Sequence, residues 1–312
     1  MKKFKITLLM VLALVLTACG SNTDKPEEGK DGDKINVVTS FTIIEDMTKR
    51  IGGDLVNVYN LVPSGTDPHE YEPLPNDIKA AEDADLLLYN GMNLEGGEHG
   101  WFFKLVHTTG QDEKRVFELN KGVEPMYLTH EDGKEEEINP HSFINPEVGI
   151  KMAENLRDAL IAVDEDNKAV YEANAEQYIS ELKAISERYA TVINSIPEER
   201  RILVTSEHAF QYMASEYGLR EAYVWEVDTE ELGTPEQIKS LVDLLREIQP
   251  PVMFMESNVD PRPLETVSKE TGIPIFEEPI YSDEIGNIGE QVDTYVKFLE
   301  HNIRIIEKGL SQ

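Results

Sequence analysis

The chain of 312 residues contains little cysteine, little tryptophan and few basic side chains. Its single cysteine excludes an intramolecular disulfide, so stability must come from packing or from a bound ligand. With 29 Lys and Arg against 60 Asp and Glu, the formal net charge is -31. This balance argues against nucleic-acid binding, which requires a basic surface. The acidity fits either an enrichment of cations near the surface or solubility in a salty or alkaline exterior.

The chain also lacks the glycine-rich fingerprints of nucleotide-binding proteins and the His-Glu-x-x-His element of many zinc hydrolases. The first absence removes most of the support for a nucleotide-binding function. The second argues against a metallohydrolase, which also needs an open coordination position and a general base. We therefore expect that the protein is not an enzyme.

The first 18 residues have the layout of a signal peptide, with a basic start and an apolar run too short to span a membrane. The run ends in Leu16-Thr17-Ala18-Cys19, which resembles the lipobox of bacterial lipoproteins. This predicts cleavage before Cys19 and attachment of acyl chains to it, which would anchor the protein to a membrane. The alternative is an ordinary signal peptide with an incidental cysteine. Residues 19–34 are small and charged, which predicts a flexible lipidated tether.

The remaining chain is long enough for two domains, and its first part alternates short β-branched runs with helical patterns. This alternation is typical of parallel α/β layers. Strands are expected at residues 35–39, 55–62, 86–89 and 116–119, and helices at 41–51, 76–84, 101–106 and 146–163. We therefore predict an N-terminal α/β lobe over residues 35–164.

The middle of the chain differs, because residues 165–196 contain almost no turn-forming residues. Leu182, Ile185, Tyr189 and Ile193 form one apolar stripe at helical spacing, and Pro197 ends the pattern. We expect one long helix here that acts as a stiff connector between two α/β blocks.

The second block repeats the alternation and predicts a C-terminal α/β lobe over residues 197–312. Thr234 and Pro235 form a helix start, with threonine as the N-cap and proline in the first turn. Strands are expected at residues 201–205, 223–227, 252–255 and 273–276, and helices at 208–217, 235–248, 263–270 and 292–310.

Four metal-ligating side chains fall in loops of this pattern: His69, His141, Glu207 and Asp283. Open α/β sheets bind ligands in the loops beyond the carboxyl ends of their strands. Two imidazoles and two carboxylates suit Mn²⁺, Fe²⁺ or Zn²⁺, and no thiolate is available for a softer site. Their wide separation in the sequence does not by itself establish that they converge.

Seven stretches carry a resemblance to a known family: residues 63–73 (PSGTDPHEYEP), 89–95 (YNGMNLE), 140–141 (PH), 204–212 (VTSEHAFQY), 224–230 (VWEVDTE), 233–238 (GTPEQI) and 254–260 (FMESNVD). Through them almost the whole mature chain resembles the cluster A-I solute-binding lipoproteins of metal ABC importers, in particular the manganese-binding surface-antigen (lipoprotein adhesin) group. The resemblance implies two α/β lobes with central sheets, joined by one long rigid helix. It also implies a metal site between the lobes, with His69, His141, Glu207 and Asp283 as the ligands.

The third ligand position bears on which metal is bound. Zinc-binding members of the family commonly place histidine there, whereas manganese and iron members place glutamate. Glu207 aligns with that position and favours Mn²⁺, but His208 follows it and is an alternative ligand if the local register shifts. Two further departures are Asn139, where many relatives have aspartate, and His130, a single histidine in place of a histidine-rich loop.

By resemblance, the protein captures Mn²⁺ outside the cytoplasm and delivers it to an ABC-transporter membrane permease, without chemistry. We expect a monomer that is attached to the cell membrane through Cys19. Two alternatives stay open: a zinc receptor of the same family, and a surface adhesin. Zn²⁺ normally binds N/O sites more tightly than Mn²⁺, so zinc binding in vitro is expected in either case.

Overall fold

The computed structural model describes residues 34–129, 135–227 and 232–311. The predicted signal peptide, the tether with Cys19, and His130 lie outside these residues. Ile35–Gln312 form one unit by their contacts. Its α-helices are α1 (Thr42–Gly52), α2 (Pro75–Glu82), α3 (Trp101–Thr109), α4 (Pro146–Val163), α5 (Lys168–Ser195), α6 (Gln211–Tyr217), α7 (Pro235–Ile248), α8 (Arg262–Thr271) and α9 (Tyr295–Leu310). Its strands are β1 (Ile35–Phe41), β2 (Val56–Val62), β3 (Leu86–Tyr89), β4 (Val116–Glu118), β5 (Tyr127–Thr129), β6 (Glu135–Ile138), β7 (Ile202–Val204) and β8 (Arg220–Ala222). Within the described ranges, every helix is too short or too polar to cross a bilayer.

The N-terminal half is built on a parallel sheet of four strands in the order β2-β1-β3-β4. Val37 in β1 pairs with Val58 in β2 and with Leu86 in β3, and β3 is buried over most of its length. Continuous apolar strands of this kind form when helices cover both faces of a sheet. The α/β class predicted from the alternation is confirmed, and the carboxyl end of β2 leads into the loop that carries His69.

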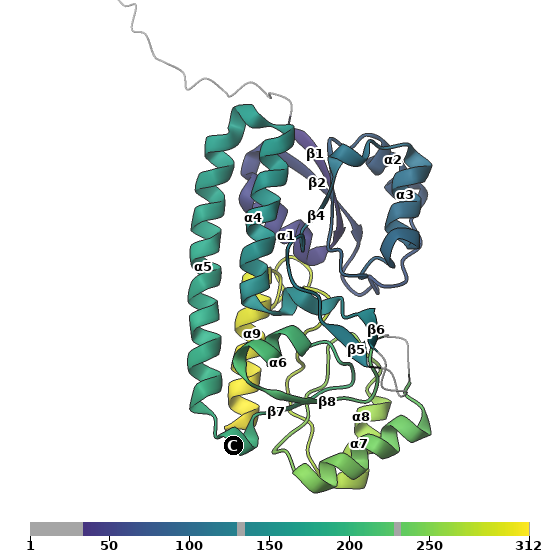
Figure 1. Cartoon of the computed structure of the whole chain (residues 1–312), viewed down its shortest axis with the longest axis vertical. Helices are drawn as coiled ribbons and strands as arrows, with labels where there is room; N and C mark the ends of the chain where they lie inside the picture. Colours follow the sequence, from purple (N-terminus) through teal and green to yellow (C-terminus); the bar gives the residue numbers. More distant parts are fainter. Residues whose placement is uncertain (1–33, 130–134, 228–231, 312) are drawn as a thin grey trace, which may run out of the picture. The chain divides into compact units, whose positions relative to one another are not determined.

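The long helix expected in the middle of the chain is present as α5, with 28 residues. At 1.5 Å per residue it is about 42 Å long. Its predicted apolar stripe is buried, including Leu182, Tyr189 and Ile193. Figure 1 shows α5 running beside α4 and, further along, beside α9, and it packs against α1 as well. The helix therefore contacts elements of both halves along its length, although the predicted lobe boundaries themselves stay a prediction.

The C-terminal half has a smaller sheet than the sequence predicts, because β7 and β8 are its only ladder among the residues described. β8 lies at Arg220–Ala222, just before the strand expected at residues 223–227. The strands expected at 252–255 and 273–276 meet only in the bridge Met253–Ile275. Pro251 directly precedes the first stretch and Pro274 lies within the second, and proline cannot donate a ladder hydrogen bond. Side chains of this region form a second hydrophobic core with Leu241, Leu245 and Leu264.

The strands β5 and β6 form a hairpin that the sequence pattern did not predict. Its strands pair antiparallel, with Tyr127 opposite Ile138. Tyr212 of α6 links the chain on both sides of the hairpin. Its hydroxyl accepts a hydrogen bond from the N–H of Met126 and donates one to the carbonyl of Asn139, each at 2.9 Å. The hairpin thus holds the chain directly before His141.

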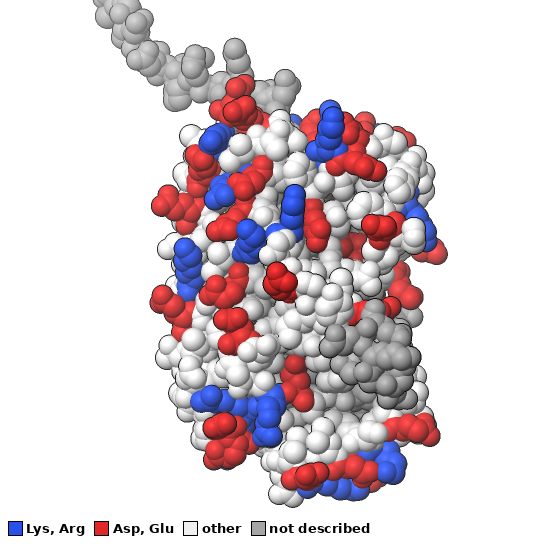
Figure 2. Space-filling view, viewed as in Figure 1, with Lys and Arg blue, Asp and Glu red and all other residues white. Residues whose placement is uncertain are grey.

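The charge of the chain lies largely on its surface. Figure 2 shows Asp and Glu spread over the visible face with Lys and Arg between them. Helix-surface ion pairs such as Lys239–Asp243 and Lys297–Asp293 add little to stability. In contrast, Glu207 and Asp283 are buried. The carboxylates of the candidate site are therefore distinct from the acidic surface.

Candidate metal centre

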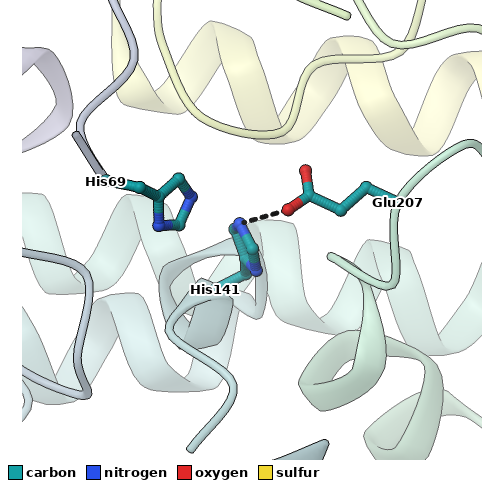
Figure 3. Close-up of side chains that lie close together, drawn as sticks. All are labelled: His69, His141 and Glu207. Atoms are coloured by element: carbon teal, nitrogen blue, oxygen red, sulfur yellow. Dashed lines mark ion pairs between the residues drawn. The ribbon is translucent and has the colours of Figure 1, made fainter. Parts of the chain in front are cut away.

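Side chains from four distant parts of the chain meet at one buried place. The Nε2 atom of His141 lies 3.0 Å from Oδ1 of Asp283 and 3.6 Å from Oε1 of Glu207. The Nε2 atom of His69 lies 3.6 Å from the same Asp283 oxygen. Figure 3 shows the rings of His69 and His141 and the carboxylate of Glu207 turned toward one another. Ligands about 2.1 Å from one cation lie roughly 3 to 3.6 Å apart, so these separations fit a single divalent ion.

His69 lies in the loop that follows β2, and this loop is tied to its own half of the molecule. The N–H of His69 donates to Oδ1 of Asp67 at 2.7 Å, and Nε1 of Trp101 donates to the carbonyl of Pro68 at 2.8 Å. The Tyr71 hydroxyl, two residues further on, is bound by Asp77. The backbone around His69 is therefore fixed, while its ring keeps 11% of its side-chain surface exposed.

His141 opens a 3₁₀ turn, His141–Ile144, and its side chain is fully buried. Its Nδ1 atom lies 2.9 Å from Oδ1 of Asn139, and Nδ2 of Asn139 donates to the carbonyl of His208 at 2.8 Å. An amide oxygen can only accept, so Nδ1 carries the proton and the Nε2 lone pair faces the carboxylates. Burial lowers the pKa of His141, which favours the neutral, ligating form. Asn139 thus binds His141 through an uncharged oxygen at the position where many relatives have aspartate.

Glu207 lies in the segment that follows β7, after Thr205 and Ser206, and is held through its backbone. The N–H groups of Ser206 and Glu207 both donate to Oε1 of Glu256, each at 2.8 Å. Burial raises the pKa of Glu256 to about 7, although these hydrogen bonds lower it. Sequence reasoning cited Glu256 only as part of a motif and gave it no role. Its signal was an acidic residue directly after an apolar stretch, which is costly to bury unless it has partners.

The two carboxylate oxygens of Asp283 have different partners. Oδ2 accepts hydrogen bonds from Ser282 at 2.6 Å and from Asn258 at 2.8 Å, while Oδ1 faces His69 and His141. The two hydrogen bonds that Oδ2 accepts stabilise the ionised form of this buried carboxyl group. Asp283 is therefore ionised and already oriented.

His208, the alternative to Glu207, is engaged elsewhere. Its ring stacks on Tyr223 with centroids 4.0 Å apart, and its nitrogens pair with Glu226 at 3.1 Å and Glu221 at 3.4 Å. Burial acts to lower the pKa of His208, but these two carboxylates raise it to about 9. A protonated imidazole cannot bind a metal. The structure therefore brings Glu207, and not the side chain of His208, to the other three residues.

The remaining described histidines lie away from this cluster. His99 and His107 are exposed. His301 is buried, and its Nε2 donates to the carbonyl of Pro279 at 2.8 Å.

Another buried glutamate, Glu95, supports the half that carries His141. Its carboxylate accepts from the Ser40 hydroxyl and from the N–H of Asn90, each at 2.7 Å. Nδ2 of Asn90 in turn donates to the carbonyl of Pro140 at 3.1 Å. The stretch 89–95 therefore acts by positioning the turn before His141, a role that a motif alone does not reveal.

The fold and the donor set together define a class of α/β protein with a preorganised nitrogen and oxygen pocket for a divalent cation. The family model described as "Zinc-uptake complex component A periplasmic" matches residues 37–309, and the chain belongs to this family. The resemblance inferred from the sequence motifs is thereby confirmed.

Among curated relatives, the chain is 45% identical over 316 residues to the manganese ABC transporter substrate-binding lipoprotein scaA of Streptococcus gordonii, covering 100% of both chains. It is 44% identical over 314 residues, again with 100% of both covered, to the metal ABC transporter substrate-binding lipoprotein SsaB of Streptococcus sanguinis.

Two solved structures share the fold. The Mn-bound periplasmic metal binding protein of Candidatus Liberibacter asiaticus matches with a TM-score of 0.78 and 28% identity, over 89% of this chain and 100% of that one. The periplasmic zinc binding protein TroA of Treponema pallidum matches with a TM-score of 0.80 and 25% identity, over 90% of this chain and 100% of that one.

Proposed function

We propose that the protein captures a divalent cation, Mn²⁺ in the first place, and hands it to an ABC importer. The observation that carries this proposal is the convergence of His69, His141 and Glu207, whose ligand atoms lie within 4.8 Å of one another. Asp283 completes the set through its contacts with both imidazoles. The cation is cargo, so the site has to bind it and release it without a reaction.

Capture follows from the state of the ligands before the metal arrives. His141 is neutral because of its burial, and Asp283 is ionised, so neither must lose a proton at neutral pH. Hydrogen bonds from Asn258 and Ser282 orient Asp283, as Asn139 orients His141. Such preorganised ligands bind tightly because little ordering is needed when the cation enters.

The choice of metal rests on the two carboxylates, which favour a harder cation over one that prefers three imidazoles. Relatives that cover the full chain are named as manganese or metal transporter lipoproteins. A zinc receptor is the second candidate, because a zinc binding protein shares the fold and Zn²⁺ competes well at N/O sites.

The proposal extends to location and partners. The relatives are named as lipoproteins of ABC transporters, which supports an extracytoplasmic protein that is anchored to the membrane and meets a permease. In this proposal Cys19 carries the lipid, the protein is a monomer, and it has no enzymatic activity. Replacing Cys19 with serine should move the protein from the membrane fraction to the soluble fraction, and retention in the membrane fraction would contradict the lipid anchor.

The test is thermal and urea unfolding of the chelated protein with added Mn²⁺, Zn²⁺, Fe²⁺ or Ca²⁺, for the wild type and Glu207→Ala. A cation at a thousand times its dissociation constant should stabilise the protein by about 4 kcal/mol. We expect a large shift with Mn²⁺ that the variant loses. A shift with Zn²⁺ alone would make the protein a zinc receptor, and no shift with any metal would refute the proposal.

A further inference from the structure

The segment that carries Asp283 is fastened to its own half of the molecule on one side. The N–H of Tyr281 donates to Oδ1 of Asn302 in α9 at 3.0 Å, and Nδ2 of Asn302 donates back to the carbonyl of Tyr281 at 2.8 Å. Asp283 follows two residues later. This double hydrogen bond fixes the direction in which the chain approaches the candidate site.

Directly after Asp283, the same segment contacts the N-terminal half through the side chain of Glu284. Oε2 of Glu284 accepts a hydrogen bond from the N–H of Gly65 and lies 3.4 Å from the hydroxyl of Ser64. Gly65 has a φ of 83°, a left-handed conformation that favours glycine. The turn that presents this N–H to the carboxylate of Glu284 therefore favours a glycine at position 65. Because Gly65 and His69 share one loop, Glu284 joins the loops of two proposed ligands.

His69 is the most accessible of the four proposed ligands. Its side chain is 11% exposed, whereas those of His141, Glu207 and Asp283 are at most 1% exposed. The ligating Nε2 atom of His69 is itself buried, but His69 lies on the side of the site nearest to solvent. We therefore take the junction between the His69 loop and the Asp283 segment as the exit route of the cation.

Glu284 and Ile285 both make contacts across this junction. A pocket of about 510 Å³ lies beside it, lined by Thr42 and Ser64 on one side and by Ile285 on the other. The N–H of Ile285 donates to the Thr42 hydroxyl at 3.1 Å. Beside the contact of Asp283 with His69 at 3.6 Å, Glu284 ties this segment to the His69 loop through Gly65 and Ser64.

We propose that Glu284 is a positioning residue that holds the His69 loop closed over the cation and so sets the rate of metal release. This inference rests on the proposed function, since it assumes that His69 and Asp283 share one cation. For the cation to leave, His69 must move away from Asp283, and that movement breaks the Glu284 contact with Gly65. Glu284 would therefore act on the dissociation rate more than on the association rate.

The experiment measures Mn²⁺ release from the preloaded protein into an excess of a fluorescent chelator by stopped flow. We expect Glu284→Ala to release Mn²⁺ about tenfold faster than wild type, the effect of losing one charge-assisted hydrogen bond. Glu284→Gln keeps an acceptor oxygen for the Gly65 N–H, so its rate should lie between the two. The association rate should stay within about twofold for both variants, which a general distortion of the site would not produce.

Glu277→Gln is the matched control, because Glu277 is an exposed glutamate on the same part of the chain and its loss changes the charge equally. A release rate for Glu284→Ala within about twofold of wild type, or an equal acceleration in Glu277→Gln, would overturn the inference. If Glu284→Ala does not fold, Glu284→Gln provides the test. Mn²⁺ release at least about threefold faster than from the wild type supports the inference, and slower release than that overturns it. If the wild type binds no Mn²⁺, the proposed function itself has failed, which is a different outcome from an unchanged release rate.

Discussion

His141 and Asn139 are joined by a hydrogen bond of 2.9 Å from Nδ1 of the ring to the amide oxygen. The bond decides the tautomer of His141, and with it which nitrogen faces Asp283 and Glu207. Because Asn139 also binds the carbonyl of His208, it connects the turn that bears His141 to the chain directly after Glu207. The uncharged side chain of Asn139 thus hydrogen-bonds to segments that carry proposed ligands in both halves of the protein.

Asn139→Ala should weaken Mn²⁺ binding by about 10- to 100-fold, the usual effect of losing the partner of a metal-bound histidine. The variant leaves the ring free to rotate and to change tautomer. Isothermal titration calorimetry on the chelated protein measures the change. Asn139→Asp keeps the acceptor oxygen and serves as the control, with an affinity within about tenfold of wild type. An alanine variant as tight as wild type would show that packing alone orients His141.

His208→Ala should leave the Mn²⁺ affinity within about threefold of wild type, whereas Glu207→Gln should lower it by more than about 100-fold. The reason is that the His208 ring faces Tyr223, Glu221 and Glu226, and its contribution to Asn139 comes from the backbone carbonyl, which alanine keeps. The stability of His208→Ala should fall by about 2 kcal/mol, because two carboxylates lose their cationic partner. Equal losses of Mn²⁺ affinity in the two variants would place the His208 ring in the site.

The alternation of apolar runs predicted the α/β class and most helices, since periodicity and caps are local properties. The capping box of Thr234 and Gln237 is an example, because it sets the start of α7 where the sequence placed it. The strand expected at residues 223–227 shows the limit. Its β-branched run predicts a strand, but the ladder with β7 forms at Arg220–Ala222 and only one bridge, Glu207–Trp225, follows. Pairing register depends on the partner strand, which the local pattern does not contain.

The four proposed ligands were named from the sequence through family resemblance, not through spacing. The residues that support these ligands were not identified from the sequence, because a buried glutamate such as Glu256 and a surface glutamate look alike in a sequence. Only the fold shows that Glu256 accepts the N–H groups of Ser206 and Glu207. The same holds for Glu284, whose partner at Gly65 is 219 residues away in the chain.

Glu95 should make the stability of the metal-free protein depend on pH. Burial raises its pKa from 4.5 to about 7, even though Ser40, Asn90 and Gly91 donate hydrogen bonds to it. A carboxyl group whose folded pKa is raised contributes stability below its unfolded pKa and loses that contribution as pH rises through the folded pKa. The contribution of Glu95 is therefore lost between about pH 4.5 and about pH 7.

Glu95→Gln does not titrate, so its stability relative to wild type should increase between pH 5 and pH 8, by roughly 1 to 3 kcal/mol. Urea unfolding of both chelated proteins at the two pH values measures this difference. Glu256 titrates in a similar range, but it is present in both proteins and cancels in the comparison. A difference in stability that is the same at pH 5 and pH 8 would contradict the raised pKa of Glu95.

Gly149 of α4 should tolerate no side chain, because a Cβ atom there would lie 2.4 Å from the hydroxyl of Tyr295. That hydroxyl donates to the carbonyl of Phe143, in the turn that begins with His141. Gly149→Ala should therefore destabilise the protein by about 1 to 3 kcal/mol, despite the better helix propensity of alanine. Tyr295→Phe removes the crowded oxygen, so in the double variant part of this cost should disappear, with a coupling of about 1 kcal/mol in a double-mutant cycle. Urea unfolding of the four chelated proteins gives the cycle. Additive effects of the two substitutions would mean that α4 moves away from α9 to make room for the methyl group. The contact between Tyr295 and the His141 turn would then not depend on a glycine at position 149.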